Sequence, residues 1–360
     1  MTCYQLFAAA LAGASVVLGA QTPDAGQDVH RRVFSLGDFR LESGVVLPGA
    51  RIAYATFGTL NAQRDNAILI PSWYGADHHG YDFLIGAGRA LDPAKDFLVA
   101  TEMFANGFSS SPSNTGSPFD GPAFPAIAIR DNVEAARRLL SELGVTHVRA
   151  VVGFSMGAQQ AFQWAVSHPD FVSAIAAYCG TAKTYPHGFV RLEGAIAALT
   201  ADAAFNDGRY TSPPKKGLAA WSRHWAGWVW SQEWWRRELF KPQWPTVEEV
   251  LASRTARDAV RDANNLISQA RTWQRHDVGD TPGFNGDHER ALASIKARVL
   301  YMPGETDLYF PIGDAQYESQ FIKNVSLTPI PSLWGHSAGS GGNAADNDFI
   351  NAQVRRFLER

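Results

Sequence analysis

The sequence is poor in cysteine. Its 360 residues contain only Cys3 and Cys179, so if the N-terminus is removed as a leader, one thiol remains and no intrachain disulfide framework is expected. Cysteine and histidine also lack the close spacing of the usual zinc sites, and no metal site is expected. Cys179 follows an apolar run, AAYCG, which favours a small buried thiol.

Charge is also scarce. Asp, Glu, Lys and Arg make up 19% of the residues, below the typical ~25%, whereas hydrophobic residues make up 46%. The net charge is −3, and no run of Lys or Arg provides a face for phosphates. The composition therefore indicates a globular protein with a well-buried core and excludes nucleic acid as an expected partner.

No apolar run is long enough for stable insertion into a membrane. The longest, Leu6–Ala20, falls short of the ~20 residues of a membrane span and resembles the apolar part of a secretory signal. No Lys or Arg precedes it, which leaves a packed N-terminal helix in a cytoplasmic protein as the alternative. We predict a signal peptide over residues 1–20, a mature N-terminus near Ala20 or Gln21, and a secreted protein.

Short apolar runs alternate with helical patterns along most of the chain. Such runs are typical of strands buried on both faces of a parallel sheet. One helical pattern, Ala128–Leu143, separates two of these runs and ends at Gly144, which favours βαβ crossovers and an α/β fold with a mostly parallel, doubly wound sheet. The predicted strands are Ala67–Pro71, Phe97–Thr101, Val148–Gly153, Ala174–Tyr178, Arg298–Met302 and Val325–Ile330.

The strand pattern stops between residues 186 and 285. This stretch is helical in pattern and rich in tryptophan, and Trp221, Trp225 and Trp228 follow the i, i+4, i+7 spacing of one helix face. We predict a helical lid over residues 186–285, inserted between core segments 35–185 and 286–360. The tryptophans are interpreted either as the core of the lid or as the lining of an apolar substrate pocket.

The motif that indicates chemistry is Gly153-Phe154-Ser155-Met156-Gly157. It follows a predicted strand and begins a helical pattern, which is the setting of a nucleophile elbow. The serine lies in a strained turn, and the flanking glycines allow the strand and helix to approach each other. Ser155 is therefore the candidate nucleophile, and a structural serine in a glycine turn is the alternative.

A serine nucleophile needs a base that a carboxylate orients, in the chain order Ser, acid, His. Asp307, in the turn after the strand at Arg298–Met302, is preferred as the acid over Glu305 and Asp314, and His336 is the candidate base. The oxyanion hole is expected from the backbone N–H groups of Met156 and Trp73. The pair His78 and His79 lies near this loop, where it could contact a substrate.

Longer stretches resemble the homoserine O-acetyltransferase family of the α/β-hydrolases. They include LDPAKDFLVATEMFANGFSSSPSNTG, GFSMGAQQAFQWAVSHPDFV, the lid segment LTADAAFNDGRY and GETDLYFP with the WGH turn. The resemblance implies the triad Ser155, Asp307 and His336, with Trp73 and Met156 as oxyanion donors. The family places an Asp after the catalytic His, where this chain has Ser337, and the chain resembles a divergent member.

The expected activity is that of an esterase-type serine hydrolase with an acyl-enzyme intermediate and a small-molecule ester or thioester substrate. An O-acyltransferase with a hydroxyl acceptor is the first alternative. A non-catalytic ligand-binding relative is the second, and it predicts a broken triad. No cofactor is implied, because acyl-CoA would be a cosubstrate in the transferase case alone. The sequence leaves the acyl group, the acceptor and the oligomeric state open.

Overall fold

A computed structural model describes residue 28 and residues 30–360 of the chain. Eight strands form one sheet in the order β1-β2-β4-β3-β5-β6-β7-β8, in which β1, β2 and β4 pair antiparallel and all later neighbours pair parallel. The strands are β1 (Arg32–Arg40), β2 (Val46–Phe57), β3 (Ala67–Pro71), β4 (Phe97–Thr101), β5 (Ala150–Phe154), β6 (Ala174–Tyr178), β7 (Arg298–Met302) and β8 (Val325–Leu327).

Strands β3, β4, β6 and β7 have the predicted bounds. They are buried on both faces and are therefore continuous apolar runs, which is the pattern that the prediction used. Strand β5 begins and ends slightly later than predicted, and β8 is shorter. The sequence reading missed the antiparallel hairpin of β1 and β2. Its burial pattern mixes exposed and buried positions, so it lacks the continuous apolar run that marks the central strands.

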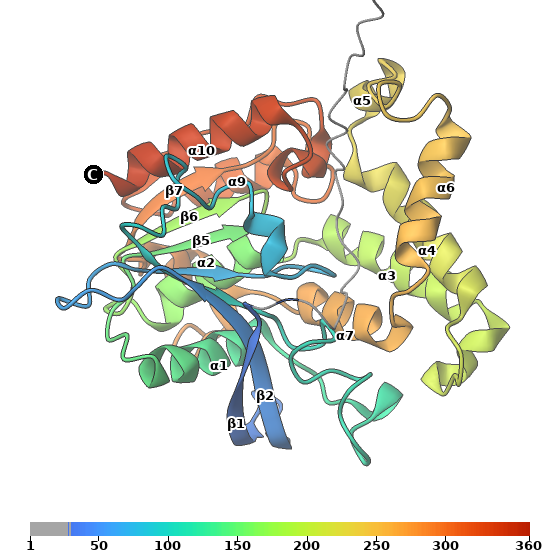
Figure 1. The fold of residues 1–360 in the computed structure, drawn as a ribbon, viewed down its shortest axis with the longest axis horizontal. Coiled ribbons are helices and arrows are strands. Elements are labelled where there is room, and N and C mark those ends of the chain that lie inside the picture. Colours follow the sequence, from blue (N-terminus) through green and yellow to red (C-terminus); the bar gives the residue numbers. More distant parts are fainter. Residues whose placement is uncertain (1–27, 29) are drawn as a thin grey trace, which may run out of the picture.

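Helices cover both faces of the sheet (Figure 1). Helices α1 (Ile129–Glu142) and α2 (Met156–Ser167) pack on one face together with α8 (His288–Ala293) and α9 (Ile312–Ser319). Helix α10 (Ala344–Leu358) packs on the other face. This arrangement is the doubly wound α/β fold predicted from the alternation of strands and helices.

Between β6 and β7 the described chain is helical and adds no strand to the sheet, in agreement with the predicted pattern. Figure 1 shows this segment on one side of the molecule. Its helices are α3 (Pro186–Thr200), α4 (Lys215–Val229), α5 (Gln232–Arg236), α6 (Val247–Asp258) and α7 (Ala263–Gln274). We refer to this segment as the lid.

Short 3-10 turns complete the chain: η1 (His78–Tyr81), η2 (Gly121–Ala123), η3 (Ala203–Gly208), η4 (Val278–Asp280) and η5 (Gly335–Gly339). The predicted signal peptide lies outside the described residues. Within the described part, no helix combines the length and apolar character needed to cross a bilayer.

Candidate active site

Ser155 lies in the sharp turn between strand β5 and helix α2. Its backbone has φ 56° and ψ −123°, a conformation that a residue with a side chain rarely adopts. The turn holds the hydroxyl at the carboxyl edge of the sheet, next to the N-terminus of α2, where the helix dipole favours negative charge. The sequence motif therefore forms the predicted strand–turn–helix element.

The two glycines of the motif have no room for a side chain. A Cβ atom on Gly153 would lie 2.1 Å from the carbonyl oxygen of Gly157, and one on Gly157 would lie 2.5 Å from the carbonyl oxygen of Pro71. Both separations are far below van der Waals contact. The close approach at Gly157 also brings the start of α2 against the end of β3, which carries the loop with Trp73.

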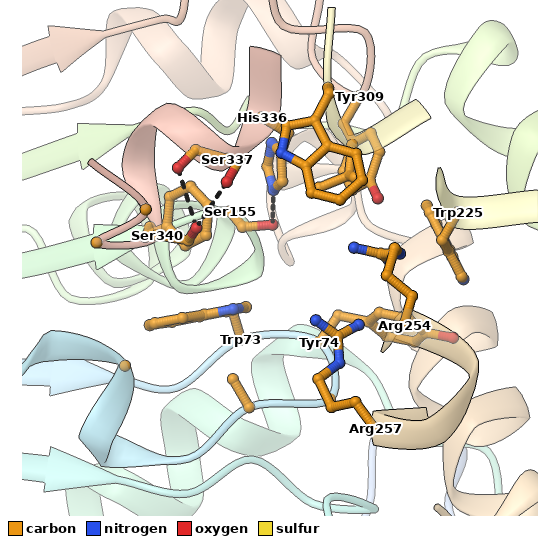
Figure 2. A pocket seen from close by; sticks show the side chains of 18 of the residues that line it. Trp73, Tyr74, Ser155, Trp225, Arg254, Arg257, Tyr309, His336, Ser337 and Ser340 are labelled. Atoms are coloured by element: carbon orange, nitrogen blue, oxygen red, sulfur yellow. Dashed lines mark hydrogen bonds between the residues drawn. The ribbon is translucent and has the colours of Figure 1, made fainter. Parts of the chain in front are cut away.

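Ser155, His336 and Asp307 form one chain of hydrogen bonds. Ser155 Oγ lies 3.0 Å from His336 Nε2, and His336 Nδ1 lies 2.8 Å from Asp307 Oδ2 (Figure 2 draws the Ser155–His336 contact). All three side chains are buried. The structure thus brings together the three side chains that the sequence predicted.

Neither rival acid takes the place of Asp307. Glu305 is exposed in the turn after β7, and Asp314 lies in helix α9, and neither is hydrogen-bonded to His336 in the described structure. The second oxygen of Asp307, Oδ1, accepts the backbone N–H of Tyr309 at 2.7 Å and that of Phe310 at 3.3 Å. These two donors fix the carboxylate and leave Oδ2 for the imidazole.

Aromatic rings hold the imidazole of His336 in place. Tyr309 stacks on it with a centroid distance of 4.1 Å, and Phe154 stacks on it at 4.7 Å. The turn that carries His336 needs Gly335 at φ 61°, where a Cβ atom would lie 2.7 Å from the backbone nitrogen of Ser231. This packing restricts the imidazole to an orientation that faces Ser155.

The loop after β3 carries Trp73, the predicted second oxyanion donor. Its backbone is tied to α2, because the side-chain amide of Gln160 donates to the carbonyl oxygen of Ser72 at 2.8 Å. In the described structure the Trp73 N–H donates to no protein acceptor. The Trp73 ring packs edge-on against Tyr81 and Phe154, each at 4.9 Å. Met156, the other predicted donor, is the first residue of α2, directly after Ser155.

A cavity of about 530 Å³ opens over Ser155 and His336. The core contributes Trp73, Phe154 and Tyr309 to its wall, and the lid contributes aromatic side chains, among them Trp221, Trp225, Trp230, Trp244 and Trp273. Trp221 and Trp225 are buried in the lid and also line the cavity, so the two interpretations of the tryptophans do not exclude each other. Ser337 and Ser340 line the cavity as well. The Ser340 hydroxyl donates to the carbonyl oxygen of Ser337 at 3.0 Å.

The sequence reading missed three arginines of the lid. Arg254, Arg257 and Arg261 line the cavity, and the first two belong to helix α6. Their i, i+3, i+7 spacing is a signal present in the sequence, because it would put all three on one face of a continuous helix, although Arg261 lies just past the end of α6. Of the histidine pair, His79 lines the cavity, whereas His78 is buried and bonded through Nδ1 to Glu102 at 2.8 Å.

The buried thiol predicted for Cys179 is confirmed. Cys179 is fully buried and free, just after β6, and burial raises the pKa of its thiol well above the ordinary value. A low-pKa nucleophilic cysteine would need an exposed, electropositive setting instead. Cys179 is therefore part of the hydrophobic core, in the same cluster as Phe154, and no rival to Ser155.

Comparison with known proteins gives the same fold. A family model described as the alpha/beta hydrolase fold matches residues 68–341. The ethyl acetate hydrolase of Pseudomonas veronii is 37% identical over 91% of this chain and 95% of its own. An acetylester hydrolase from Corynebacterium glutamicum has a solved structure with a TM-score of 0.89 and 36% identity, over 92% of this chain and 96% of its own.

The predicted resemblance to homoserine O-acetyltransferases is also confirmed. The homoserine O-acetyltransferase of Nostoc punctiforme is 30% identical, over 87% of this chain and 92% of its own. That identity is lower than with the two esterases. The chain therefore belongs to the α/β hydrolase fold family, as an enzyme related to esterases and, at lower identity, to homoserine O-acetyltransferases.

Proposed function

We propose that this enzyme hydrolyses carboxylic esters through an acyl-enzyme on Ser155, with His336 as general base and acid and Asp307 as the carboxylate that orients it. The observation that carries the proposal is the unbroken chain of hydrogen bonds from Ser155 through His336 to Asp307. A non-catalytic relative would have no reason to keep this chain inside a cavity. The intact geometry favours an enzyme with this mechanism.

The mechanism proceeds in two steps. His336 Nε2 takes the hydroxyl proton as Ser155 Oγ attacks the ester carbonyl carbon, and it gives the proton to the alcohol oxygen as the ester bond breaks. A water molecule then attacks the acyl-enzyme, and His336 takes a proton from the water and returns it to Ser155 Oγ. In both steps Asp307 holds the Nδ1 proton and stabilises the imidazolium.

Two backbone N–H groups would stabilise the oxyanion of each tetrahedral intermediate. In the proposed arrangement these are the N–H of Met156, at the N-terminus of α2, and that of Trp73. The start of α2 lies against the end of β3, and the Trp73 N–H has no acceptor among the described residues, so both features suit this role. Each such donor stabilises the transition state by about 3 kcal/mol.

We infer that water takes the acyl group and that the acyl group is small, as in an acetyl ester. The two esterase relatives are named for acetic esters, and both are more similar to this chain than the acetyltransferase. A zwitterionic acceptor such as homoserine would need a carboxylate close to the triad for its ammonium group. Asp77 and Asp82 also line the cavity, but they are already bonded to Arg31 and His79. At the position next to His336, this chain offers the neutral hydroxyl of Ser337.

The second candidate is transfer of the acyl group from acyl-CoA to a hydroxyl acceptor. It is favoured by the 30% identity with a homoserine O-acetyltransferase. The test supplies acetyl-CoA with homoserine beside simple aryl acetates in water, with Ser155→Ala as the control. Hydrolysis of the esters with negligible O-acetylhomoserine supports the proposal, and efficient O-acetylhomoserine formation with negligible ester hydrolysis would overturn it.

We further propose that the protein is exported, on the sequence of residues 6–20 alone. An exported protein would lack acetyl-CoA, which also favours hydrolysis. N-terminal sequencing of the protein from its native source tests this proposal. A mature N-terminus near Ala20 or Gln21 is the expected result, and recovery of Met1 or Thr2 would refute it.

A further inference from the structure

Arg254 is a buried cation without an anion of its own. Arg254 belongs to helix α6, and 8% of the residue is exposed. Within the described structure the guanidinium donates to no carboxylate or carbonyl, and its buried Nε has no acceptor. In the described structure its one cation–π contact is with the ring of Trp230, whose centroid lies 5.0 Å from Cζ. Burial and the neighbouring Arg257 lower the pKa of Arg254 to about 10.

The acidic group that acts on Arg254, the carboxylate of Asp258, is already shared by two other arginines. Asp258 accepts from Arg257 Nε at 2.9 Å and from Arg261 Nε at 3.1 Å, and it also accepts the Ser222 hydroxyl at 2.8 Å. Three guanidinium cations therefore surround one carboxylate, which leaves a net charge of +2. The lowered pKa of Asp258, about 2, reflects these partners working against its burial.

A second buried arginine shows what a structural cation looks like in this protein. Arg191 lies outside the cavity wall and packs over three rings, with Cζ 4.3 Å from the Tyr309 centroid, 4.7 Å from that of Trp273 and 5.2 Å from that of Trp225. Such cation–π contacts offset part of the cost of burying a charge. Arg254 has one ring in place of three, and it faces the cavity.

The cavity that Arg254 lines is the one over Ser155. Figure 2 shows Arg254 and Arg257 reaching from the lid into the space that the Ser155 hydroxyl faces. Removing a cation from water without a partner is unfavourable, and an anionic ligand would offset this cost. Guanidinium groups match the planar carboxylate in charge and geometry.

We propose that Arg254, assisted by Arg257, binds a carboxylate of the substrate, so that the preferred substrate is the acetyl ester of a small hydroxycarboxylic acid. The proposal rests on the proposed esterase function, which puts the acetyl group at Ser155 and hence the carboxylate on the alcohol part. The phosphates of acyl-CoA suit this subsite less well. The pantetheine arm separates them from the thioester, whereas Arg254 is buried in the same cavity as Ser155.

The experiment compares two matched substrates, the acetyl ester of γ-hydroxybutyrate and the acetyl ester of its amide. They differ in charge and little in shape. We expect the wild-type kcat/KM for the carboxylate to exceed that for the amide by roughly 10- to 100-fold, as a charge-assisted hydrogen bond gives. Arg254→Gln should reduce this ratio to near one. Arg223→Gln, which removes an exposed arginine of α4, should keep the wild-type ratio.

Two further substrates test which part of the substrate carries the anion that Arg254 binds. Monoethyl succinate carries the carboxylate on the acyl side, and acetyl-CoA carries phosphates. An Arg254-dependent preference for either one over the γ-hydroxybutyrate ester would overturn the proposal. A wild-type ratio near one would overturn it too, while hydrolysis of the neutral ester would leave the esterase function intact. Failure on every ester, neutral ones included, would instead overturn the proposed function.

Thermal stability distinguishes a ligand-binding arginine from a structural one. Because Arg254 is buried without an anion, Arg254→Gln should keep or raise the melting temperature. A marked fall in melting temperature, together with an equal loss of activity on both matched substrates, would assign Arg254 a structural role and overturn the proposal.

Discussion

Replacement of Asp307 by asparagine should inactivate the enzyme while leaving its fold intact. In the native structure Oδ1 accepts two backbone N–H groups, from Tyr309 and Phe310, and Oδ2 accepts from His336 Nδ1. The asparagine oxygen must face the two backbone donors, because the amide NH₂ in that place would oppose them. The NH₂ group then faces Nδ1, which must become an acceptor. The imidazole proton moves to Nε2, and His336 can no longer accept the proton of Ser155.

The wrong tautomer lowers kcat by about 10⁴-fold where it has been imposed on a Ser-His-Asp triad, equivalent to about 5 kcal/mol in the activation free energy. The assay is the hydrolysis of an aryl acetate by Asp307→Asn, with circular dichroism to show that the fold is kept. Glu305→Gln, at the exposed rival acid in the same turn, is the matched control and should keep wild-type activity. An Asp307→Asn variant that keeps a tenth of the activity or more would refute the reasoning.

Three further predictions concern stability. Gly157→Ala should lower both melting temperature and activity, because the new Cβ would lie 2.5 Å from a backbone oxygen; a variant with unchanged melting temperature would contradict the packing. Trp234→Ala should cost about 3–5 kcal/mol of unfolding free energy, since Trp234 is fully buried and stacks on Trp230 at 4.3 Å; denaturant unfolding measures it, and a loss below 1 kcal/mol would contradict the stacking. Burial lowers the pKa of His288, but the hydrogen bond to Asp277 and the neighbouring carboxylate of Glu318 outweigh it and raise this pKa from 6.5 to about 9. The stabilisation from His288 is therefore full below pH 6.5 and is lost as the pH rises through about 9. His288→Gln should flatten this slope in a pH series of melting temperatures, and an equally steep slope in the variant would assign it to other groups.

The sequence predicted those parts of the fold that depend on local pattern. The central strands are continuous apolar runs, and the elbow at Ser155 is defined by two glycines that tolerate no side chain. The hairpin of β1 and β2 was missed because it lies at the edge of the sheet, where partly exposed positions interrupt the apolar pattern. Its place in the sheet follows from pairing with β4, which is a tertiary contact.

In the active site, too, the features set by local sequence pattern were predicted and those set by tertiary packing were missed. Asp307 and His336 follow predicted strands, and the parallel sheet brings the ends of these strands to the edge where Ser155 lies. The tryptophans of the lid were interpreted as its core or as the lining of an apolar pocket, yet the lid also brings Arg254 to the cavity. Whether an arginine is exposed or buried depends on the packing of α6 over the cavity, and no local pattern settles that. Its lack of an acid partner likewise becomes visible only when Asp258 is seen to bind two other arginines.

The central claim is that Ser155 forms the acyl-enzyme. Rapid-quench mass spectrometry of the protein mixed with an aryl acetate, followed by peptide mapping, tests it most directly. We expect one acetyl group on the wild-type peptide that contains Ser155. Rapid quenching is needed because water breaks down the acetyl-enzyme. A fluorophosphonate, whose adduct does not break down, should label the same peptide stoichiometrically and leave Ser155→Ala unlabelled. Full labelling of Ser155→Ala, or an adduct on another residue of the wild type, would contradict the account.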